Sequence, residues 1–253
     1  MKLRSYATLV QDISLKTRQE MFELLAACYH NVFWEQFQRD LAEKKWTIII
    51  EDSETHALKG FSTLKVFLHD FQGEKSRLAF SGDTIISPSC WGSLRLPMAF
   101  GKLMLHVLSE RPNIPLYWML ITKGIRTYRV LPVFFKKFYP RHDEKTPVKI
   151  RQMMKSLGHG CFPQQYDDEI GIIRAGADSQ SLRREFSGEE DLQLRDDGHV
   201  RHFLRANPGH IKGDELLCLA EFSLGNLCPY IIRQLEKADD VEILRNDNQL
   251  SGV

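Results

Sequence analysis

The chain has 253 residues, of which 43% are hydrophobic and 26% charged, as is typical of a folded globular protein. Its 34 basic and 33 acidic side chains leave a net charge of +1, which argues against a nucleic-acid-binding protein, because such proteins carry a basic excess. The five cysteines are widely spread and form no C-x-x-C pair, so we expect reduced thiols, no metal site and a cytoplasmic location. No apolar run approaches the ~20 residues of a membrane span, and the apolar stretch near the first residue is too short for a secretory signal.

The first hundred residues alternate between the two periodicities of strands and helices. The predicted elements are a strand at 3–13, a helix after a capping box at 17–20, a helix at 34–44, and strands at 46–52, 60–71 and 76–88. Polar residues at 72–75 predict a hairpin between the last two strands. Gly82 interrupts the strand at 76–88, which predicts a bulge or a close approach of another backbone.

In the second half of the chain, the secondary-structure patterns are clear up to residue 140 and weaker beyond it. We predict a helix from Pro97 to about Arg111, a strand at 115–122 that is buried on both faces, and a helix at 126–140 kinked at Pro132. Beyond residue 140 the predictions are a helix near 147–157, short strands at 169–176 and 199–208, and one or two helices within 215–238. The charged stretch 183–197 predicts a mobile loop.

The segment SGDTIISPSCWGSLRLPMAFGK, residues 81–102, is the first candidate for a binding site. A strand ends at Pro88, a short loop follows, and a helix opens near Pro97. Backbone N–H groups at a helix N-terminus bind phosphate-bearing ligands, and the loop carries Gly92 and the basic Arg95. The alternative is an ordinary strand-to-helix turn in which Trp91 fills a crevice.

The order of the elements resembles the GNAT family, the N-acyltransferases related to the Gcn5 histone acetyltransferase. Two local matches carry the resemblance, which covers roughly residues 3–140. The strand TIISP with its loop and helix is similar to the family's acyl-CoA strand and pyrophosphate loop, and PLYWMLIT is similar to its next strand, with a helix ending in FFKKFYP. The loop SCWGSLRL has only one of the family's glycines, and the family's helix-ending tyrosine falls on Phe135.

The resemblance implies a fold of the α+β or α/β class, with a mixed, mostly antiparallel twisted sheet flanked by helices. We expect a GNAT-like core at residues 1–176 and a C-terminal extension at 177–253 packed on it. The implied activity is transfer of an acyl group to the amine of a small molecule or peptide by direct attack. The donor would be an acyl-CoA or the phosphopantetheine of an acyl carrier protein. The residues expected to contact it are Ile85, Ile86, Ser87, Trp91, Gly92, Ser93, Leu94, Arg95, Leu96, Thr122, Arg126 and Arg129.

Two residues are candidates for proton transfer. Asp83 is a carboxylate inside a predicted strand, where carboxylates are disfavoured, and an amine needs a base before it attacks a thioester. Tyr128 is placed to protonate the departing thiolate. The alternatives are an exposed strand carboxylate for Asp83 and an amphipathic core residue for Tyr128.

The remaining signals leave alternatives open. The dense basic set of Lys123, Arg126, Arg129, Lys136, Lys137 and Arg141 could meet coenzyme A phosphates, an acidic carrier protein or only solvent. On a strand, His199 and His202 would point to opposite faces, so we expect no metal site there.

The second functional hypothesis is a binding or assembly module on a GNAT fold that no longer catalyses. Acceptor, acyl length and oligomeric state stay open.

Overall fold

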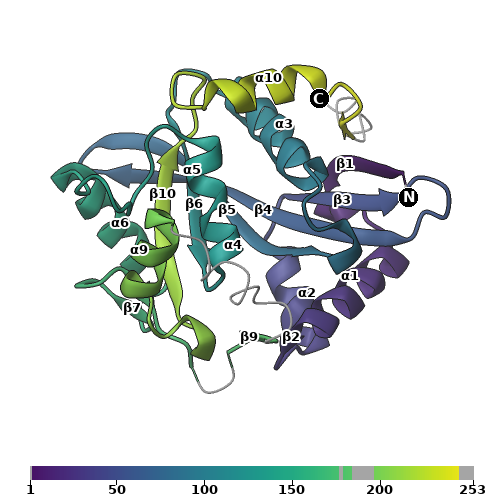
Figure 1. The fold of residues 1–253 in the computed structure, drawn as a ribbon, viewed down its shortest axis with the longest axis horizontal. Coiled ribbons are helices and arrows are strands. Elements are labelled where there is room, and N and C mark those ends of the chain that lie inside the picture. The colour runs from purple at the N-terminus through teal and green to yellow at the C-terminus, as the bar shows by residue number, and fades with distance from the viewer. Residues whose placement is uncertain (1, 177–178, 184–196, 245–253) are drawn as a thin grey trace, which may run out of the picture.

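In the computed structural model, which describes residues 2–176, 179–183 and 197–244, a large mixed sheet runs through the molecule (Figure 1). The strands are β1 (Leu3–Leu9), β2 (Tyr29–His30), β3 (Trp46–Asp52), β4 (Leu58–Phe71), β5 (Glu74–Ile86), β6 (Leu116–Thr122), β7 (Tyr166–Asp167), β8 (Ile172–Ile173), β9 (Ser181–Leu182), β10 (Glu215–Glu221) and β11 (Glu242–Ile243). Their order in the sheet is β11-β1-β3-β4-β5-β6-β10-β8-β7, and β2 pairs with β9 separately. Only the β5–β6 and β1–β11 pairs are parallel among the described strands. The predicted fold class is therefore confirmed.

Helices cover both faces of the sheet. They are α1 (Leu15–Cys28), α2 (Trp34–Ala42), α3 (Arg95–Glu110), α4 (Ile125–Tyr128), α5 (Val130–Phe134), α6 (Val148–Cys161), α9 (Gly198–Ala206) and α10 (Pro229–Lys237). Figure 1 shows α3 and α10 together at the top, with α1 and α2 at the lower right.

The apolar residues of the strands divide between these faces with the period of two that a strand imposes. Ile48 and Ile50 pack in the largest apolar cluster with residues of α3, α4, α5, α9 and α10, whereas Ile49 packs with α1 and α2. Trp118 joins the same large cluster, but its neighbour Met119 joins a third cluster built on α6. One face thus has one continuous core, and the other has two separate ones.

The elements predicted between residues 46 and 122 are confirmed within a few residues. β3 spans the predicted range, and β4 and β5 form the predicted hairpin. The pairing of β4 with β5 slips near Gly82: Ser62 faces Thr84, but Leu64 faces Ser81, so β5 has one extra residue there. This is the predicted bulge. At α1 the cap differs from the prediction, because Ser14 accepts the N–H of Thr17.

Three predictions after residue 122 are wrong. The strand predicted at 199–208 is helix α9, which Asp197 caps by accepting the N–H groups of His199 and Val200. Within 215–238, the predicted helices begin only with α10, because the first seven residues form β10. An apolar run of this length suits a central strand buried on both faces as well as it suits a helix.

The third error concerns residues 126–140. The chain forms α4 and α5 and then continues in an extended conformation, so that Tyr139 pairs with Leu219 of β10. Pro132 lies within the short α5, which ends two residues later. The strand predicted at 169–176 reduces to β8, and of the loop predicted at 183–197, residues 184–196 lie outside the described part of the chain.

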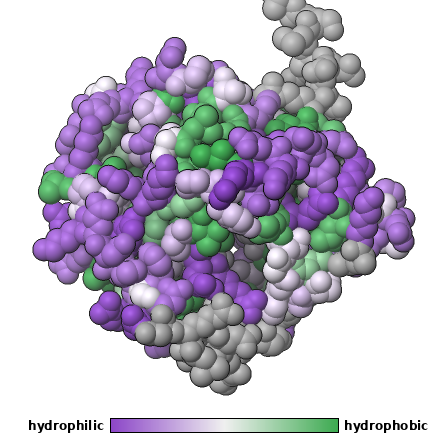
Figure 2. Space-filling model, turned by 45° about the horizontal axis from the view of Figure 1, so that its top comes forward, coloured by the Kyte–Doolittle hydropathy of each residue, from purple (hydrophilic) through white to green (hydrophobic). Residues whose placement is uncertain are grey.

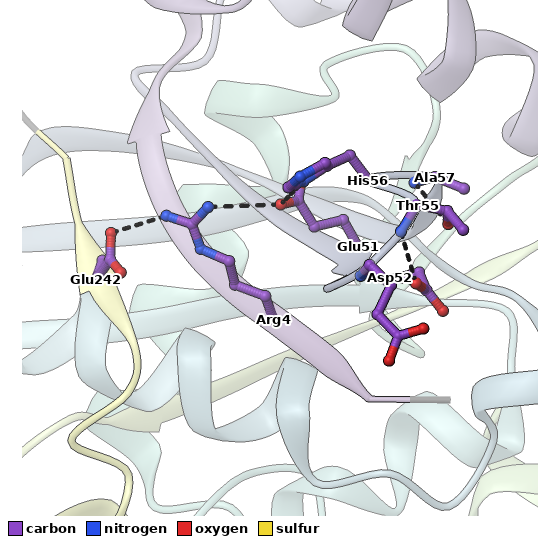
Figure 3. A network of polar contacts seen from close by, with 8 residues as sticks. Arg4, Glu51, Asp52, Thr55, His56, Ala57 and Glu242 are labelled. Carbon is purple, nitrogen blue, oxygen red and sulfur yellow. Dashed lines mark hydrogen bonds and ion pairs between the residues drawn. The ribbon is translucent and has the colours of Figure 1, made fainter.

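The C-terminal region is part of the sheet. β10 lies between β6 and β8, and β11 pairs with β1 at the far edge. Figure 3 shows the polar contacts at that edge. Arg4 binds Glu242 of β11 at 3.0 Å and Glu51 of β3 at 3.6 Å, and His56 Nδ1 lies 3.2 Å from Glu51. The 177–253 region therefore supplies both an inner strand and an edge strand.

On the face drawn in Figure 2, apolar surface occurs as patches separated by polar side chains. Within the described ranges, none of the helices has the length and hydrophobicity to cross a bilayer.

Arg77 fixes the direction of α3. Its side chain is buried on β5, and its guanidinium donates hydrogen bonds to the carbonyls of Val107, Leu108, Arg111 and Ile114. A cation that satisfies the last carbonyls of a helix also interacts favourably with its dipole. Arg77 therefore holds the C-terminus of α3 against β5, which directs its N-terminus to the loop that follows β5.

We expect Arg77→Met to lower the free energy of unfolding by about 3 kcal/mol, because buried carbonyls lose a charged donor. Urea unfolding measures the loss. Arg111→Ala is the control, since that side chain is exposed at the same helix end and its change leaves the Arg77 contacts in place. A loss no larger than that of the control would contradict the role of Arg77.

Candidate functional site

The parallel strands β5 and β6 separate partway along their length. They pair from Arg77 with Leu116 to Phe80 with Met119, and no pairing follows although both strands continue. Trp118 Nε1 donates to Ser81 Oγ at 3.0 Å just where the pairing ends. Beyond this link, the edges of the two strands enclose a gap.

The bulge at Gly82 and Asp83 turns backbone groups into this gap. Arg77 donates its N–H to Pro115 on the β6 side, whereas Ser87 donates its N–H to Lys59 on the β4 side. The two residues are ten apart, so in a regular strand their N–H groups would point to the same side. The extra residue reverses the alternation, and the N–H and C=O groups of Thr84 and Ile86 therefore face the gap.

A cleft of about 960 Å³ lies beside the gap, on the face that has two separate cores. One wall includes Tyr29 and residues of α2, and the opposite wall includes Phe162 and Ile173 of the α6 core. Gly82, Asp83 and Thr84 lie between them. The volume is at the upper end of the range for small-molecule sites.

Asp83, the predicted base, lines this cleft. Burial raises the pKa of its carboxyl group to about 6, an effect that Lys44 and Lys123 oppose and that Asp40 and Glu215 reinforce. Its carboxylate makes no hydrogen bond or ion pair within the described residues. A carboxylate that accepts a proton near neutral pH is suited to general base catalysis.

Three residues around Asp83, namely Tyr29, Lys44 and Glu215, were not predicted, and Lys123 was predicted only as a member of the basic set. Lys123 lies 3.4 Å from Glu215, and its ammonium stands 5.6 Å from the centre of the Tyr29 ring. Burial raises the pKa of Tyr29, and the charges of Asp83 and Glu215 raise it further. Lys44 lines the same cleft from the end of α2. No local motif marks these residues, because four separate segments bring them together.

The predicted phosphate loop forms a turn that leads into α3. Residues Pro88–Cys90 make a short 3-10 helix, and Gly92 has a φ of +83°, which favours glycine. Ser93 Oγ accepts the N–H of Arg95, while the N–H groups of Gly92, Leu94 and Leu96 have no acceptor among the described residues. The loop therefore presents free donors at the start of a sixteen-residue helix.

Trp91 lies against the open edge of β5. Its Nε1 donates to the carbonyl of Ile86 at 3.3 Å, which is one of the groups that the bulge turns into the gap. The guanidinium of Arg126 stands 4.2 Å from the centre of the Trp91 ring. Because Arg126 follows β6, the stacked pair connects the two strands across the gap, and the indole is 37% exposed.

Several predicted residues have other contacts. Tyr128 is fully buried and donates its hydroxyl to the carbonyl of Pro140 at 2.9 Å, so the structure does not bring it to the cleft. Arg95 pairs with Asp240, and Arg129 pairs with Asp197 at 3.1 Å. Thr122 Oγ1 accepts the N–H of Gly124 and stabilises the turn after β6.

The other residues predicted to contact the acyl donor do not all lie at the gap. Ile85 is buried in the core beneath α1, because its side chain points to that face of the sheet, and Leu96 packs against the large core. Ser87 bonds its hydroxyl to that of Ser89 at 3.1 Å. Ile86 and the loop 91–94 are thus the predicted contacts that the structure gathers at the open end of β5.

Half of the predicted basic set forms ion pairs within the chain. Lys123 and Arg129 are paired as described above, Arg141 pairs with Asp143, and Lys136 donates to the carbonyl of Gly225 at 2.9 Å. Lys123, Arg129 and Arg141 are thus compensated within the chain, whereas Lys136 and Lys137 are exposed. His199 and His202 lie on a helix, and both rings contact Tyr128. In the described ranges, no group of side chains is suited to a metal ion.

No protein-family model and no curated protein sequence matches the chain. Among solved structures, the matches include a probable N-acyltransferase from Enterococcus faecalis V583, with 19% identity, a TM-score of 0.41, and coverage of 55% of this chain and 33% of that one. They also include the GNAT family N-acetyltransferase YhbS from Escherichia coli in complex with CoA, with 14% identity, a TM-score of 0.37, and coverage of 51% and 68%.

A third match is the N-myristoyltransferase of Saccharomyces cerevisiae with bound myristoyl-CoA, with 13% identity, a TM-score of 0.38, and coverage of 49% and 30%. The chain thus spans about a third of the length of the first and third of these proteins. Many of the similar structures are GNAT family N-acetyltransferases, the family that the sequence resembles. Because these likenesses are weak, we argue the function from the geometry of the chain itself.

We expect Asp83→Asn to stabilise the protein at pH 8 but not at pH 4. The pKa of Asp83 is raised from 3.8 in the unfolded chain to about 6 in the folded one, so its ionisation lowers stability as the pH rises between these values. The gain at pH 8 should be ~2–3 kcal/mol by urea unfolding. Glu35→Gln, which changes an exposed carboxylate on the same cleft, should give the same small effect at both pH values.

Proposed function

We propose that the protein is an N-acyltransferase that moves an acyl group from an acyl-CoA thioester to an amine. The observation that carries this proposal is the gap between β5 and β6, lined by backbone groups of Thr84 and Ile86 and ending at the free N–H groups of the 91–96 turn. An extended ligand with amide groups and a terminal diphosphate fits this gap, because strand edges pair with amides and a helix N-terminus binds phosphate. Pantetheine with its nucleotide is a ligand of this kind. We call the gap, with the backbone groups that line it, the donor track.

The reaction needs only groups that the cleft provides. An acceptor enters as an ammonium ion, and Asp83 takes one proton from it and later releases that proton to water. The free amine attacks the thioester carbonyl, a backbone N–H at the bulge stabilises the oxyanion, and the carbon–sulfur bond breaks. The second proton lost from the nitrogen passes to the departing thiolate. The products are an amide, a thiol and a proton, and no covalent enzyme intermediate forms.

The donor is proposed to be a coenzyme A thioester rather than a carrier protein. Of the basic side chains that could have met an acidic carrier, Lys123, Arg129 and Arg141 form ion pairs inside the chain. Tyr128 is left out of the mechanism, since its hydroxyl is engaged with Pro140. Within the cleft, the pKa of Tyr29 is raised, which makes it a poor proton donor.

The first test is whether acyl-CoA binds and whether Asp83 matters for turnover. We expect coenzyme A, acetyl-CoA or a longer acyl-CoA to raise the melting temperature by mass action. Asp83→Asn should lower kcat by about 10²–10⁴ while leaving donor binding unchanged. Glu54→Gln, which changes an exposed carboxylate outside the cleft, is the control and should keep full activity. A protein that binds acyl-CoA but transfers nothing to any amine would instead be a binding module, and one that binds no acyl-CoA would contradict the proposal.

A second test concerns Trp91, whose indole lies against the open edge of β5. Donor amides need the carbonyl of Ile86, which Trp91 occupies, so Trp91→Phe should bind coenzyme A about five-fold more tightly. Calorimetry measures the affinity. Trp34→Phe, which changes an aromatic residue of the α1–α2 core, should leave it unchanged. Weaker binding in Trp91→Phe than in Trp34→Phe would show that the donor does not use this carbonyl.

A further inference from the structure

Two opposite charges face the cleft without partners. Lys44 Nζ donates to the main-chain carbonyl of Asp40 at 3.0 Å, and within the described residues it has no ion pair. The carboxylate of Asp83, the residue after Gly82, has none either. Both residues are half-buried and line the same cleft. An ammonium and a carboxylate that share a cavity but do not pair with each other can each bind a group of one ligand.

The position of Lys44 is fixed by the bulge. A Cβ atom at Gly82 would lie 2.7 Å from Lys44 Cε and 2.5 Å from Thr63 Oγ1, so a glycine there leaves room for the lysine stem. The ammonium stands 5.8 Å from the centre of the Phe80 ring. The stem therefore crosses the bulge beside Asp83, and the ammonium is held within the cleft rather than in solvent.

The other half-buried charged side chains that line the cleft already have side-chain partners. Lys123 pairs with Glu215 at 3.4 Å, and the carboxylate of Asp40 accepts a hydrogen bond from the neutral amide of Gln36 at 2.7 Å. Arg174, which is exposed, pairs with Asp214 at 3.0 Å. On the rim, Glu35 and Arg39 are exposed. Lys44 and Asp83 are thus the half-buried pair that a ligand can still satisfy.

We propose that the acceptor is an α-amino acid whose amino group meets Asp83 and whose carboxylate binds Lys44. This inference rests on the proposed acyl transfer and names its acceptor class. A ligand with a cation beside an anion satisfies both charges, whereas a simple amine leaves Lys44 facing a second positive charge. A polyamine fits worse still, because Lys44 and Lys123 both flank Asp83.

The residues that line the cleft also indicate which side chain the acceptor amino acid should have. Phe80, Phe162, Ile121 and Ile173 line the side that belongs to the α6 core, and Tyr29 lies opposite. Such surfaces favour an apolar side chain. Acyl transfer to this acceptor forms one carbon–nitrogen bond and breaks one carbon–sulfur bond. The products are an N-acyl amino acid, the free thiol and one proton.

The test compares phenylalanine, its amide and phenethylamine as acceptors at saturating acyl-CoA. The three compounds share the ring and the amine, and only the first has a carboxylate. Wild-type protein should show a KM for phenylalanine about ten-fold or more below that for the amide, because a charge-assisted bond to Lys44 is lost. Equal KM values for the acid and the amide would overturn the inference while leaving acyl transfer intact.

Variants at two positions assign the effect to Lys44. Lys44→Met should remove the preference for the carboxylate, with little change for phenethylamine, and Lys44→Arg should keep it. Gly82→Ala should reduce it too, because the added methyl group displaces the lysine stem. Glu54→Gln, which changes an exposed carboxylate outside the cleft, should have no effect. A preference that persists in Lys44→Met would also overturn the inference.

Binding measured without turnover separates this inference from the proposed function. Phenylalanine and phenylalaninamide are titrated calorimetrically into the protein with and without coenzyme A. Tighter binding of the acid, lost in Lys44→Met, supports the acceptor class even if no acyl transfer is detected. Equal or undetectable binding of both compounds contradicts it, even if another amine is acylated.

Discussion

The site depends on one extra residue in β5. A regular strand would present the same alternation of backbone groups along its whole length, and it would stay paired with β6. The bulge at Gly82 and Asp83 reverses the alternation, so the amides of Thr84 and Ile86 face the gap while Ser87 stays bonded to β4. The same bulge directs Asp83 into the cleft. A single backbone irregularity thus provides both the track and the proposed base.

The surrounding structure holds this gap open. The large core on one face is continuous from β1 to β10, whereas the opposite face has one core under α1 and α2 and another under α6. The cleft occupies the space between these two cores. Arg77 and the bond from Trp118 to Ser81 fix the strands and α3 at the closed end. The open end is then the place where the turn at Gly92 presents its free N–H groups.

Sequence patterns predicted the part of the fold in which local periodicity and burial agree. β3, the β4–β5 hairpin, the bulge at Gly82, α3 and β6 are examples. The patterns failed where one apolar run suited two structures, as in β10, or where a cap decided the outcome, as Asp197 does for α9. Asp83 was predicted as a site residue because a carboxylate is unusual inside a strand, and the structure places it at the cleft. Lys44, Tyr29 and Glu215 carry no signal in the sequence, because only the tertiary fold brings them to one cleft with Lys123. Tyr128, the second predicted catalytic residue, lies in the core instead.

The central claim is that the bulge turns two amides into a donor track, and amide chemical shifts test it directly. In a titration of ¹⁵N-labelled protein with coenzyme A, the N–H signals of Thr84 and Ile86 should move, while those of Ile85 and Ser87, which face β4, should stay nearly fixed. Equal movement of all four signals, or movement of none while coenzyme A binds elsewhere, would contradict the account.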